Sequence, residues 1–124
     1  MSCIFCRIVA GEIPAEVVDR TPDTLAFLDV TPLADGHTMM IPTAHVARIE
    51  DMTPAAAALF RTVQRLAGPV RKAVNAAGNT IGINDGDGSG QTIPHVHVHI
   101  VPRWPNDGGG SVPTIFRGGG SVRR

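Results

Sequence analysis

The sequence predicts an α+β protein with about five short strands, one long helix and a short helix near its N-terminus. Histidine and β-branched residues alternate from His95 to Val101, which is typical of a strand with one buried face. Apolar residues between Leu59 and Val74 recur at steps of three and four, which is typical of an amphipathic helix. Shorter runs bounded by Gly and Pro supply the other strands.

The composition fits one small domain with balanced charge. The chain has 124 residues, with 11 Lys plus Arg and 11 Asp plus Glu. This balance gives no reason to expect a nucleic-acid or membrane partner. No apolar run approaches the ~20 residues that span a bilayer, and the first residues lack a signal-peptide core, so we expect a cytoplasmic protein. We expect a single domain over residues 1–105 and a Gly-rich, flexible tail over residues 106–124.

Cys3 and Cys6 begin the chain, in a short helical segment that Pro14 ends. The two thiols permit three interpretations: a redox pair, half of a zinc site, or two small buried hydrophobic residues. A zinc site needs two more ligands. His45 and one of the later histidines, for which we take His95, can supply them.

Three strands are expected in the first third of the chain, over Glu16–Arg20, Thr24–Asp29 and Gly36–Pro42. The first two are separated by a turn that contains Pro22. Asp29 ends the second strand, and by residue type alone it is a turn or cap residue.

The long helix is expected to begin at Thr53, followed by Pro54 at the first helical position. Gly68 and Pro69 interrupt the pattern, because an interior proline removes a hydrogen bond. We therefore expect a kink near Gly68, or two shorter helices. Gly78 is the expected C-terminal cap.

A strand over Thr80–Asn84 leads into a glycine-rich loop over residues 84–94. Such a loop is either a plain hairpin turn or a concavity of free N–H groups that binds an anion. Gln91 and Thr92 add side-chain donors at its end. Beside a histidine-bearing strand, we favour the phosphate-binding interpretation.

His95, His97 and His99 are expected on one face of their strand, because successive side chains point to opposite faces. Three imidazoles can bind a metal, supply a nucleophile with an acid and an orienting group, or be inert.

Together these motifs resemble the histidine triad (HIT) family of nucleotide hydrolases and transferases, in its branch of small, single-domain purine-nucleotide-binding proteins. The resemblance extends from about Ser2 to Arg103. The matching motifs are Cys3-Ile4-Phe5-Cys6-Arg7-Ile8, Gly11-Glu12-Ile13-Pro14, Phe27-Leu28-Asp29, Gly36-His37-Thr38, Ile41-Pro42, His45, Asn84, Gly90-Gln91-Thr92 and the alternating histidines.

The resemblance implies a HIT-like fold with an antiparallel sheet. It implies a hydrolase or nucleotidyl transferase that cleaves a purine nucleotide conjugate at its α-phosphate, either a nucleoside phosphoramidate or a dinucleoside polyphosphate. His97 matches the nucleophile that forms a covalent nucleotidyl-histidine. His99 matches the residue next to a phosphate oxygen, and His95 would orient and polarise with it. His37 matches a histidine near the phosphates and the triad.

The resemblance also implies substrate and metal contacts. Asp29 matches the acceptor of the ribose hydroxyls, and Gln91 and Thr92 would bind phosphate oxygens or assist the leaving group. The full substrate-binding set is Leu28, Asp29, Asn84, Gly90, Gln91, Thr92, His97 and His99. Some relatives hold a structural zinc, for which the ligands here would be Cys3, Cys6, His45 and His95. A homodimer is implied as well.

Three functional hypotheses remain open. The first is the nucleotidyl-transferring hydrolase. The second is a purine-nucleotide-binding protein with incidental turnover that acts through a protein partner. The third is a zinc hydrolase whose three alternating histidines are the ligands. The glycine-rich loop argues against the third, because a zinc triad needs no such neighbour, and an intact His97 weakens the second.

Overall fold

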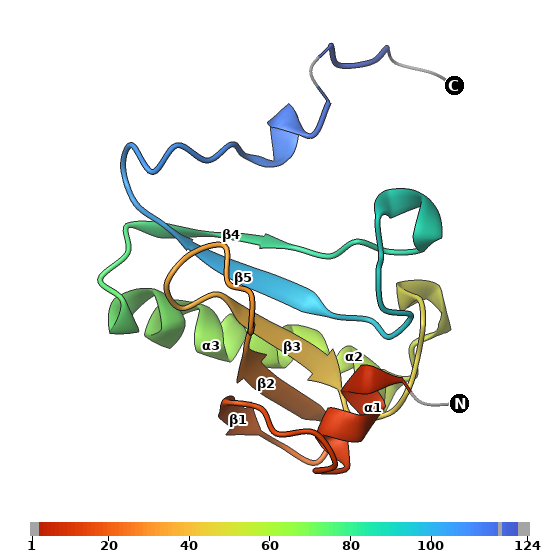
Figure 1. Cartoon of the computed structure of the whole chain (residues 1–124). Coiled ribbons are helices and arrows are strands. Elements are labelled where there is room, and N and C mark those ends of the chain that lie inside the picture. The colour runs from red at the N-terminus through yellow and green to blue at the C-terminus, as the bar shows by residue number, and fades with distance from the viewer. Residues whose placement is uncertain (1–2, 117, 122–124) are drawn as a thin grey trace.

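The computed structural model describes residues 3–116 and 118–121, and it confirms the α+β fold. Five strands form one antiparallel sheet in the order β1-β2-β3-β5-β4 (Figure 1). The strands are β1 (Val17–Arg20), β2 (Thr24–Leu28), β3 (Thr38–Pro42), β4 (Gly78–Gly82) and β5 (Val98–Arg103). The helices are α1 (Ile4–Val9), α2 (Pro54–Ala57) and α3 (Leu59–Ala73), with 3-10 turns η1 (Ile49–Asp51), η2 (Asp87–Ser89) and η3 (Val112–Thr114).

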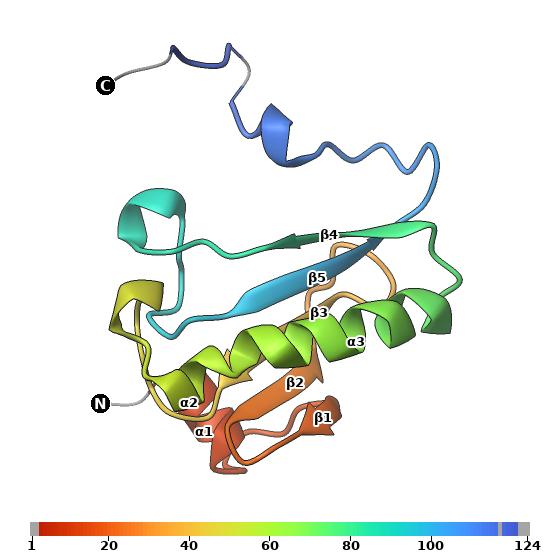
Figure 2. The same cartoon turned by 180° about the vertical axis from the view of Figure 1, so that it is seen from behind.

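The sheet separates two apolar clusters. Helix α3 covers one face, and the short α1 lies against the other (Figures 1 and 2). The α3 cluster contains Ala26, Met40, Leu59, Leu66, Val70, Val96, Val98 and Ile100. The α1 cluster contains Cys3, Phe5, Leu25, Phe27, Met39 and Ile41. Both faces of the central strands are therefore buried, which explains why β2 and β3 contain nearly continuous apolar runs.

The alternation around β5 is confirmed, but the strand starts later than expected. Val96 and Val98 enter the α3 cluster, whereas the ring of His97 contacts Phe5 on the opposite side. Regular strand pairing begins only at Val98. Before it, the N–H of Val96 donates to the carbonyl of Val46 in a loop rather than to a strand. The alternation is a property of extended backbone, so it continues where the ladder does not.

The helical region is divided in two as expected, but at Ala58 rather than at Gly68. Helix α3 runs without interruption through Gly68 and Pro69, so the expected position of the kink was wrong. Pro69 is exposed, so the carbonyl that loses its partner can be hydrated by solvent. The start at Thr53 is confirmed, since its side chain accepts a hydrogen bond from the N–H of Ala56.

The end of α3 also differs from expectation. Gly78 is the first residue of β4 and not a helix cap. The left-handed position after the helix is taken by Asn75, whose φ is 55°. Asparagine tolerates this region better than other residues with a side chain, which explains why no glycine is needed there.

None of the described helices is long and apolar enough to cross a membrane. After β5 the chain leaves the sheet, and η3 is the helical turn in the described part of the tail. The flexibility expected for residues 106–124 stays a prediction, and residues 117 and 122–124 lie outside the described residues.

We predict that Leu59→Ala lowers the free energy of unfolding by about 2–5 kcal/mol, because it opens a cavity between α3 and the sheet. Leu59 is 0% exposed, whereas Leu33 is 79% exposed. The matched control Leu33→Ala should change stability by less than about 0.5 kcal/mol. Urea denaturation of both variants measures the difference, and equal losses would contradict the placement of Leu59 in the core.

Candidate active site

The histidine-bearing face of β5 opens into a cavity of about 470 Å³ between α1 and the end of β2. One wall is apolar and comes from α1, β2 and the segments that follow them. The opposite wall is polar and comes from the glycine-rich loop and β5. The lining residues are Ile4, Phe5, Ile8, Ile13, Pro14, Ala15, Phe27, Leu28, Asp29, Val30, Thr31, Met39, Asn84, Gly90, Thr92, Ile93, His97 and His99.

The tautomer of His97 follows from its backbone contact. Its Nδ1 lies 2.8 Å from the carbonyl oxygen of His95. A carbonyl only accepts, so Nδ1 must carry the proton and donate it. In the neutral ring, Nε2 then keeps a free lone pair. His97 is 5% exposed and lines the cavity, so the structure provides an oriented, potentially nucleophilic nitrogen there.

A second chain of hydrogen bonds defines His99. The N–H of Leu33 donates to Nδ1 of His37 over 3.1 Å, so the proton of neutral His37 is on Nε2. That Nε2 lies 2.9 Å from Nδ1 of His99 and donates to it. Neutral His99 therefore has its own proton on Nε2. This leaves His99 as a hydrogen-bond donor beside the lone pair of His97, with the two ring centroids 5.1 Å apart.

Burial keeps the rings of His37 and His99 neutral. It lowers the pKa of His99 to about 4, with further lowering by His97 and His37 and an opposing effect of Asp29. Burial also lowers the pKa of His37, which is 2% exposed, and Asp29 partly offsets this. The donor and acceptor pattern deduced for His37 and His99 thus applies at neutral pH.

Asp29 lies directly after β2, at the mouth of the cavity. Its Oδ1 accepts hydrogen bonds from the N–H and the hydroxyl of Thr31, at 2.9 and 3.2 Å. Its Oδ2 lies 3.5 Å from Nε2 of His37. The turn interaction expected from residue type and the position in the cavity expected from the resemblance are therefore both present.

The side chain of Gln91 joins the glycine-rich loop to the segment around Ala47. The side-chain oxygen of Gln91 accepts from the N–H of Gly86 at 2.9 Å, and its Nε2 donates to the carbonyl of Ala47 at 2.8 Å. Gly86 has a φ of 91°, and a Cβ there would meet the guanidinium of Arg48 at 3.0 Å. Gln91 was expected to bind phosphate, but its side chain does not line the cavity. Its polar groups hold the backbone of the loop instead.

Cys3, Cys6, His45 and His95 form a compact donor cluster on the far side of α1. Their ligand atoms all lie within 4.8 Å of one another. The Sγ of Cys6 lies 3.2 Å from Nδ1 of His45 and 3.6 Å from Nδ1 of His95, and the Sγ of Cys3 lies 3.5 Å from the latter. A tetrahedral zinc, with Zn–S about 2.3 Å and Zn–N about 2.0 Å, separates sulfur from nitrogen by roughly 3.6 Å. The donor set therefore fits zinc in both chemistry and spacing.

The ring of His95 is oriented toward this cluster. Its Nε2 donates to the carbonyl of Pro42 at 2.8 Å, so the lone pair on Nδ1 faces the two thiols. A backbone carbonyl that fixes the tautomer is a common partner of metal-binding histidines. The ring is 0% exposed and lies outside the cavity, so a direct contact of this ring with substrate, as the expected polarising role requires, is not supported.

The structure therefore brings together seven predicted substrate contacts and separates the others. The cavity contains Leu28, Asp29, Asn84, Gly90, Thr92, His97 and His99. His37, Gln91 and His95 lie outside the cavity lining. His37 is hydrogen-bonded to His99, Gln91 to the glycine-rich loop, and the carbonyl of His95 to the ring of His97. Within the described part of the chain, neither group of clustered metal donors includes His97, which argues against the hypothesis that the three alternating histidines share one zinc.

The apolar wall combines side chains from α1 and β2. Ile8 and Phe27 line the cavity, whereas Leu25 is fully buried and Leu33 lines a different pocket. Phe5 was missed as a site residue. Its ring makes an edge contact with His97, with centroids 5.1 Å apart. An apolar residue of a short helix looks the same in sequence whether it lines a core or a cavity.

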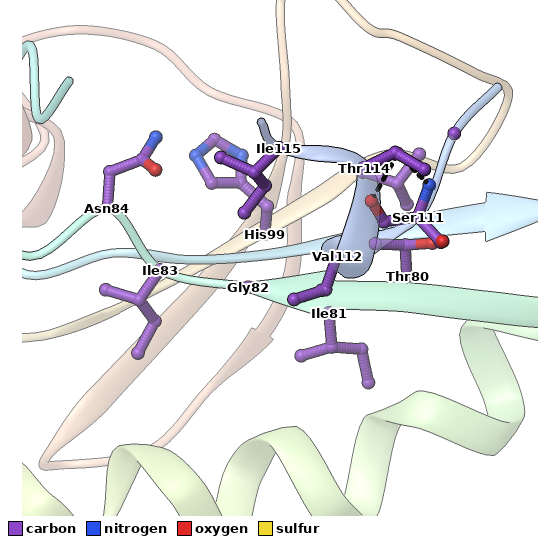
Figure 3. A pocket seen from close by; sticks show the side chains of 12 residues that line it. Thr80, Ile81, Gly82, Ile83, Asn84, His99, Ser111, Val112, Thr114 and Ile115 are labelled. Atoms are coloured by element: carbon purple, nitrogen blue, oxygen red, sulfur yellow. Dashed lines mark hydrogen bonds between the residues drawn. The ribbon is translucent and has the colours of Figure 1, made fainter. Parts of the chain in front are cut away.

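A second cavity, of about 560 Å³, adjoins the first at Asn84 and His99. Figure 3 shows the ring of His99 near Ile115 of the C-terminal segment, with Val112 over β4 and Asn84 farther along the cavity. The hydroxyl of Thr114 bonds both the N–H and the carbonyl of Ser111, which closes the turn η3. The C-terminal segment therefore passes next to His99.

The sheet, the oriented histidines and the glycine-rich loop define a histidine triad protein. A family model described as the HIT domain matches residues 10–106. The match spans most of the chain, and the chain therefore belongs to the HIT family.

Several curated relatives have names that describe nucleotide hydrolysis. The adenosine 5'-monophosphoramidase hnt1 of Schizosaccharomyces pombe is 37% identical, over 86% of this chain and 77% of that protein. A bis(5'-nucleosyl)-tetraphosphatase of the same yeast is 40% identical, over 77% of this chain and only 53% of that longer protein. An uncharacterized HIT-like protein of Methanocaldococcus jannaschii is 41% identical, over 86% of this chain and 82% of that protein.

Solved structures agree with the fold. A HIT family member from Bacillus subtilis superimposes with a TM-score of 0.83 at 37% identity, covering 90% of this chain and 81% of that one. A zinc-bound histidine triad protein from Mycobacterium smegmatis superimposes with a TM-score of 0.80 at 41% identity, covering 86% and 78%.

We predict that the free energy of unfolding falls as the pH falls from about 6.5 toward 4. The pKa of His99 is about 4 in the fold, whereas an unfolded histidine titrates near pH 6.5. Between these values the unfolded chain binds more protons, so stability present above pH 6.5 is lost on acidification. His99→Asn, which keeps an acceptor but no titrating ring, should flatten this dependence. Urea denaturation at a series of pH values, with a chelator present, tests this. Parallel plots of unfolding free energy against pH for the variant and the wild type would contradict it.

Proposed function

We propose that this protein hydrolyses purine nucleotide conjugates at the α-phosphate, through a covalent nucleotidyl intermediate on His97. The supporting observation is the hydrogen bond from Nδ1 of His97 to the carbonyl of His95, at 2.8 Å. It leaves the Nε2 lone pair free in a cavity whose rim includes Gly90 and Thr92. A neutral imidazole aimed in this way is an activated nucleophile.

The chemistry takes two steps. Nε2 of His97 forms a bond to phosphorus while the bond to the leaving group breaks, and the leaving group takes a proton from water. The ring becomes a cation whose Nδ1–H still donates to the carbonyl of His95. Hydroxide from that water then opens the P–N bond, which yields the nucleoside monophosphate and returns His97 to the neutral form. The sum is hydrolysis by one water.

The neighbours of His97 suit a phosphoryl group. The Nε2–H of His99 can donate to a phosphate oxygen without adding a titrating charge. The hydroxyl of Thr92 supplies a further donor from the polar wall, whereas the N–H groups of Ser89, Gly90 and Gln91 donate to carbonyls within the loop. Positioning and electrostatic stabilisation dominate phosphoryl transfer, so donors fixed in advance are the appropriate machinery.

The rest of the cavity suits a nucleoside. Asp29 offers carboxylate oxygens, which only accept hydrogen bonds, to the two hydroxyls of a ribose. Ile8 and Phe27 line the apolar side, where a purine base can be buried. The names of the relatives include both a phosphoramidase and a dinucleoside tetraphosphatase, so both substrate types belong in the test.

We further propose that Cys3, Cys6, His45 and His95 hold one structural zinc. The spacing of the sulfur and nitrogen atoms supports this, as does the zinc-bound relative from Mycobacterium smegmatis. Zinc would cross-link α1 to the chain around β3 and β5 and leave the chemistry to His97. The homodimer implied by the resemblance, and the cytoplasmic location, stay predictions.

We predict that His97→Gly lowers turnover by roughly a thousandfold or more, because no other ring can replace the nucleophile. Binding of AMP should change little, since the apolar wall and Asp29 remain. Adenosine and guanosine phosphoramidates and diadenosine polyphosphates serve as substrates, and calorimetry measures AMP binding. Added imidazole should restore part of the turnover.

An unchanged rate in this variant would end the nucleophile proposal. AMP binding by the wild type with negligible turnover of every substrate would instead favour a nucleotide-binding protein that acts through a partner.

We predict one zinc per chain in mass spectrometry under native conditions. Cys6→Ser should lose the metal, because a thiolate ligand is removed. Asp29→Asn is the matched control, and it should retain zinc. It alters the other group of possible metal donors, Asp29, His37 and His99, whose members already take part in hydrogen bonds. A metal-free wild-type mass with two titratable thiols would refute the zinc proposal.

A further inference from the structure

We propose that the cysteine–histidine cluster is thermodynamically coupled to the nucleotide cavity, so that bound zinc raises nucleotide affinity and bound nucleotide raises zinc affinity. This inference rests on the proposed nucleotide site. The cluster, formed by Cys3, Cys6, His45 and His95, lies outside the cavity, yet three separate connections join it to elements that form the cavity.

The first connection passes through His95 to the nucleophile. The side chain of His95 supplies Nδ1 to the cluster, and its backbone carbonyl accepts from Nδ1 of His97. The ring is held from its other side by the carbonyl of Pro42. A metal that fixes this ring therefore also restrains the carbonyl that orients the ring of His97.

The second connection passes through α1 to the apolar wall. This helix has six residues and no side-chain cap, and isolated helices shorter than about 12 residues are marginal in water. Cys3 precedes it and Cys6 lies within it, so a metal bound to both thiols would anchor it. Phe5, between them, is 3% exposed and its ring contacts both His95 and His97, with centroids 5.8 and 5.1 Å apart.

The third connection passes through the segment that follows His45 to the glycine-rich loop. The carbonyl of Ala47 accepts from Nε2 of Gln91 at 2.8 Å, and the N–H of Ile49 donates to Oδ1 of Asp85 at 2.9 Å. Gln91 in turn accepts from the N–H of Gly86. Gln91 and Asp85 are therefore positioning residues, which tie the phosphate-binding loop to a segment that begins at a metal ligand.

Mutual stabilisation follows from these connections. The ligand that orders the shared elements first leaves less ordering for the second ligand to accomplish, which is positive coupling. Because coupling free energies are reciprocal, zinc and nucleotide must change each other's affinity by the same factor. The ordered elements are α1 and the loop 85–91, which both contribute lining residues, and the segment 45–49, which is hydrogen-bonded to the loop.

The test measures the coupling in both directions on the whole chain: the effect of zinc on AMP binding, and the effect of AMP on zinc release. AMP, the product, is titrated by calorimetry into zinc-loaded and chelator-treated protein, so no turnover is involved. Zinc transfer from loaded protein to a chelating dye is then followed with and without saturating AMP, which requires no folded metal-free protein. We expect AMP to bind at least about fivefold more tightly to loaded protein and to slow zinc release by a similar factor.

A variant isolates the third connection. Gln91→Met keeps the length of the side chain but removes both hydrogen bonds, so the effect of AMP on zinc release should shrink. Gln64→Met is the matched control, because Gln64 is exposed on α3 and is not among the residues that line the cavity, and it should retain the wild-type effect.

Each result decides the inference. Equal AMP affinity in loaded and metal-free protein, with zinc release unaffected by AMP, would overturn the coupling while leaving the nucleotide site intact. Failure to bind zinc would overturn it as well. Failure of AMP to bind either form would instead overturn the proposed function. If the coupling were undiminished in Gln91→Met, neither Gln91 nor the loop would transmit it.

Discussion

The site depends on one local hydrogen bond, from Nδ1 of His97 to the carbonyl of His95. The two residues are separated by one position, so the bond requires only that the chain stay extended ahead of β5. The bond determines which nitrogen carries the proton, and thereby which nitrogen faces the cavity with a lone pair. The other donors and acceptors of the site are arranged around that choice.

Hydrogen bonds to the backbone also set the tautomers of His37 and His95, and His37 in turn sets that of His99. An N–H that donates to His37 makes His99 a donor toward the cavity, and a carbonyl that accepts from His95 turns its lone pair toward the thiols. Burial lowers the pKa of His37, His95 and His99, which keeps these neutral tautomers populated. Four identical side chains thus acquire different chemistry from different hydrogen-bond partners, because a neutral imidazole has one donor and one acceptor.

The sheet keeps this chemistry apart from the main hydrophobic core. Val96, Val98 and Ile100 pack into the α3 cluster, while His97 and His99 face the cavity on the other side of the extended chain. Helix α1 has only six residues, so the apolar wall that it supplies depends on packing of Cys3 and Phe5 against the sheet. The four possible zinc ligands therefore lie next to residues that line the cavity, although they lie outside it.

Much of the fold and part of the site followed from the sequence alone. Alternation determined that His97 and His99 share a face, and the Thr53–Pro54 signal determined where the helical region begins, because both are local properties of the backbone. Only the tertiary structure decided that Gln91 braces the loop, that the ring of His95 leaves the cavity, and that α3 runs through Pro69. Gln91 bonds to Ala47, and the ring of His95 faces the two thiols, so both depend on residues distant in sequence. Helix α3 tolerates Pro69 because folding leaves that position exposed to solvent. No local pattern encodes which of its possible partners a side chain meets after folding.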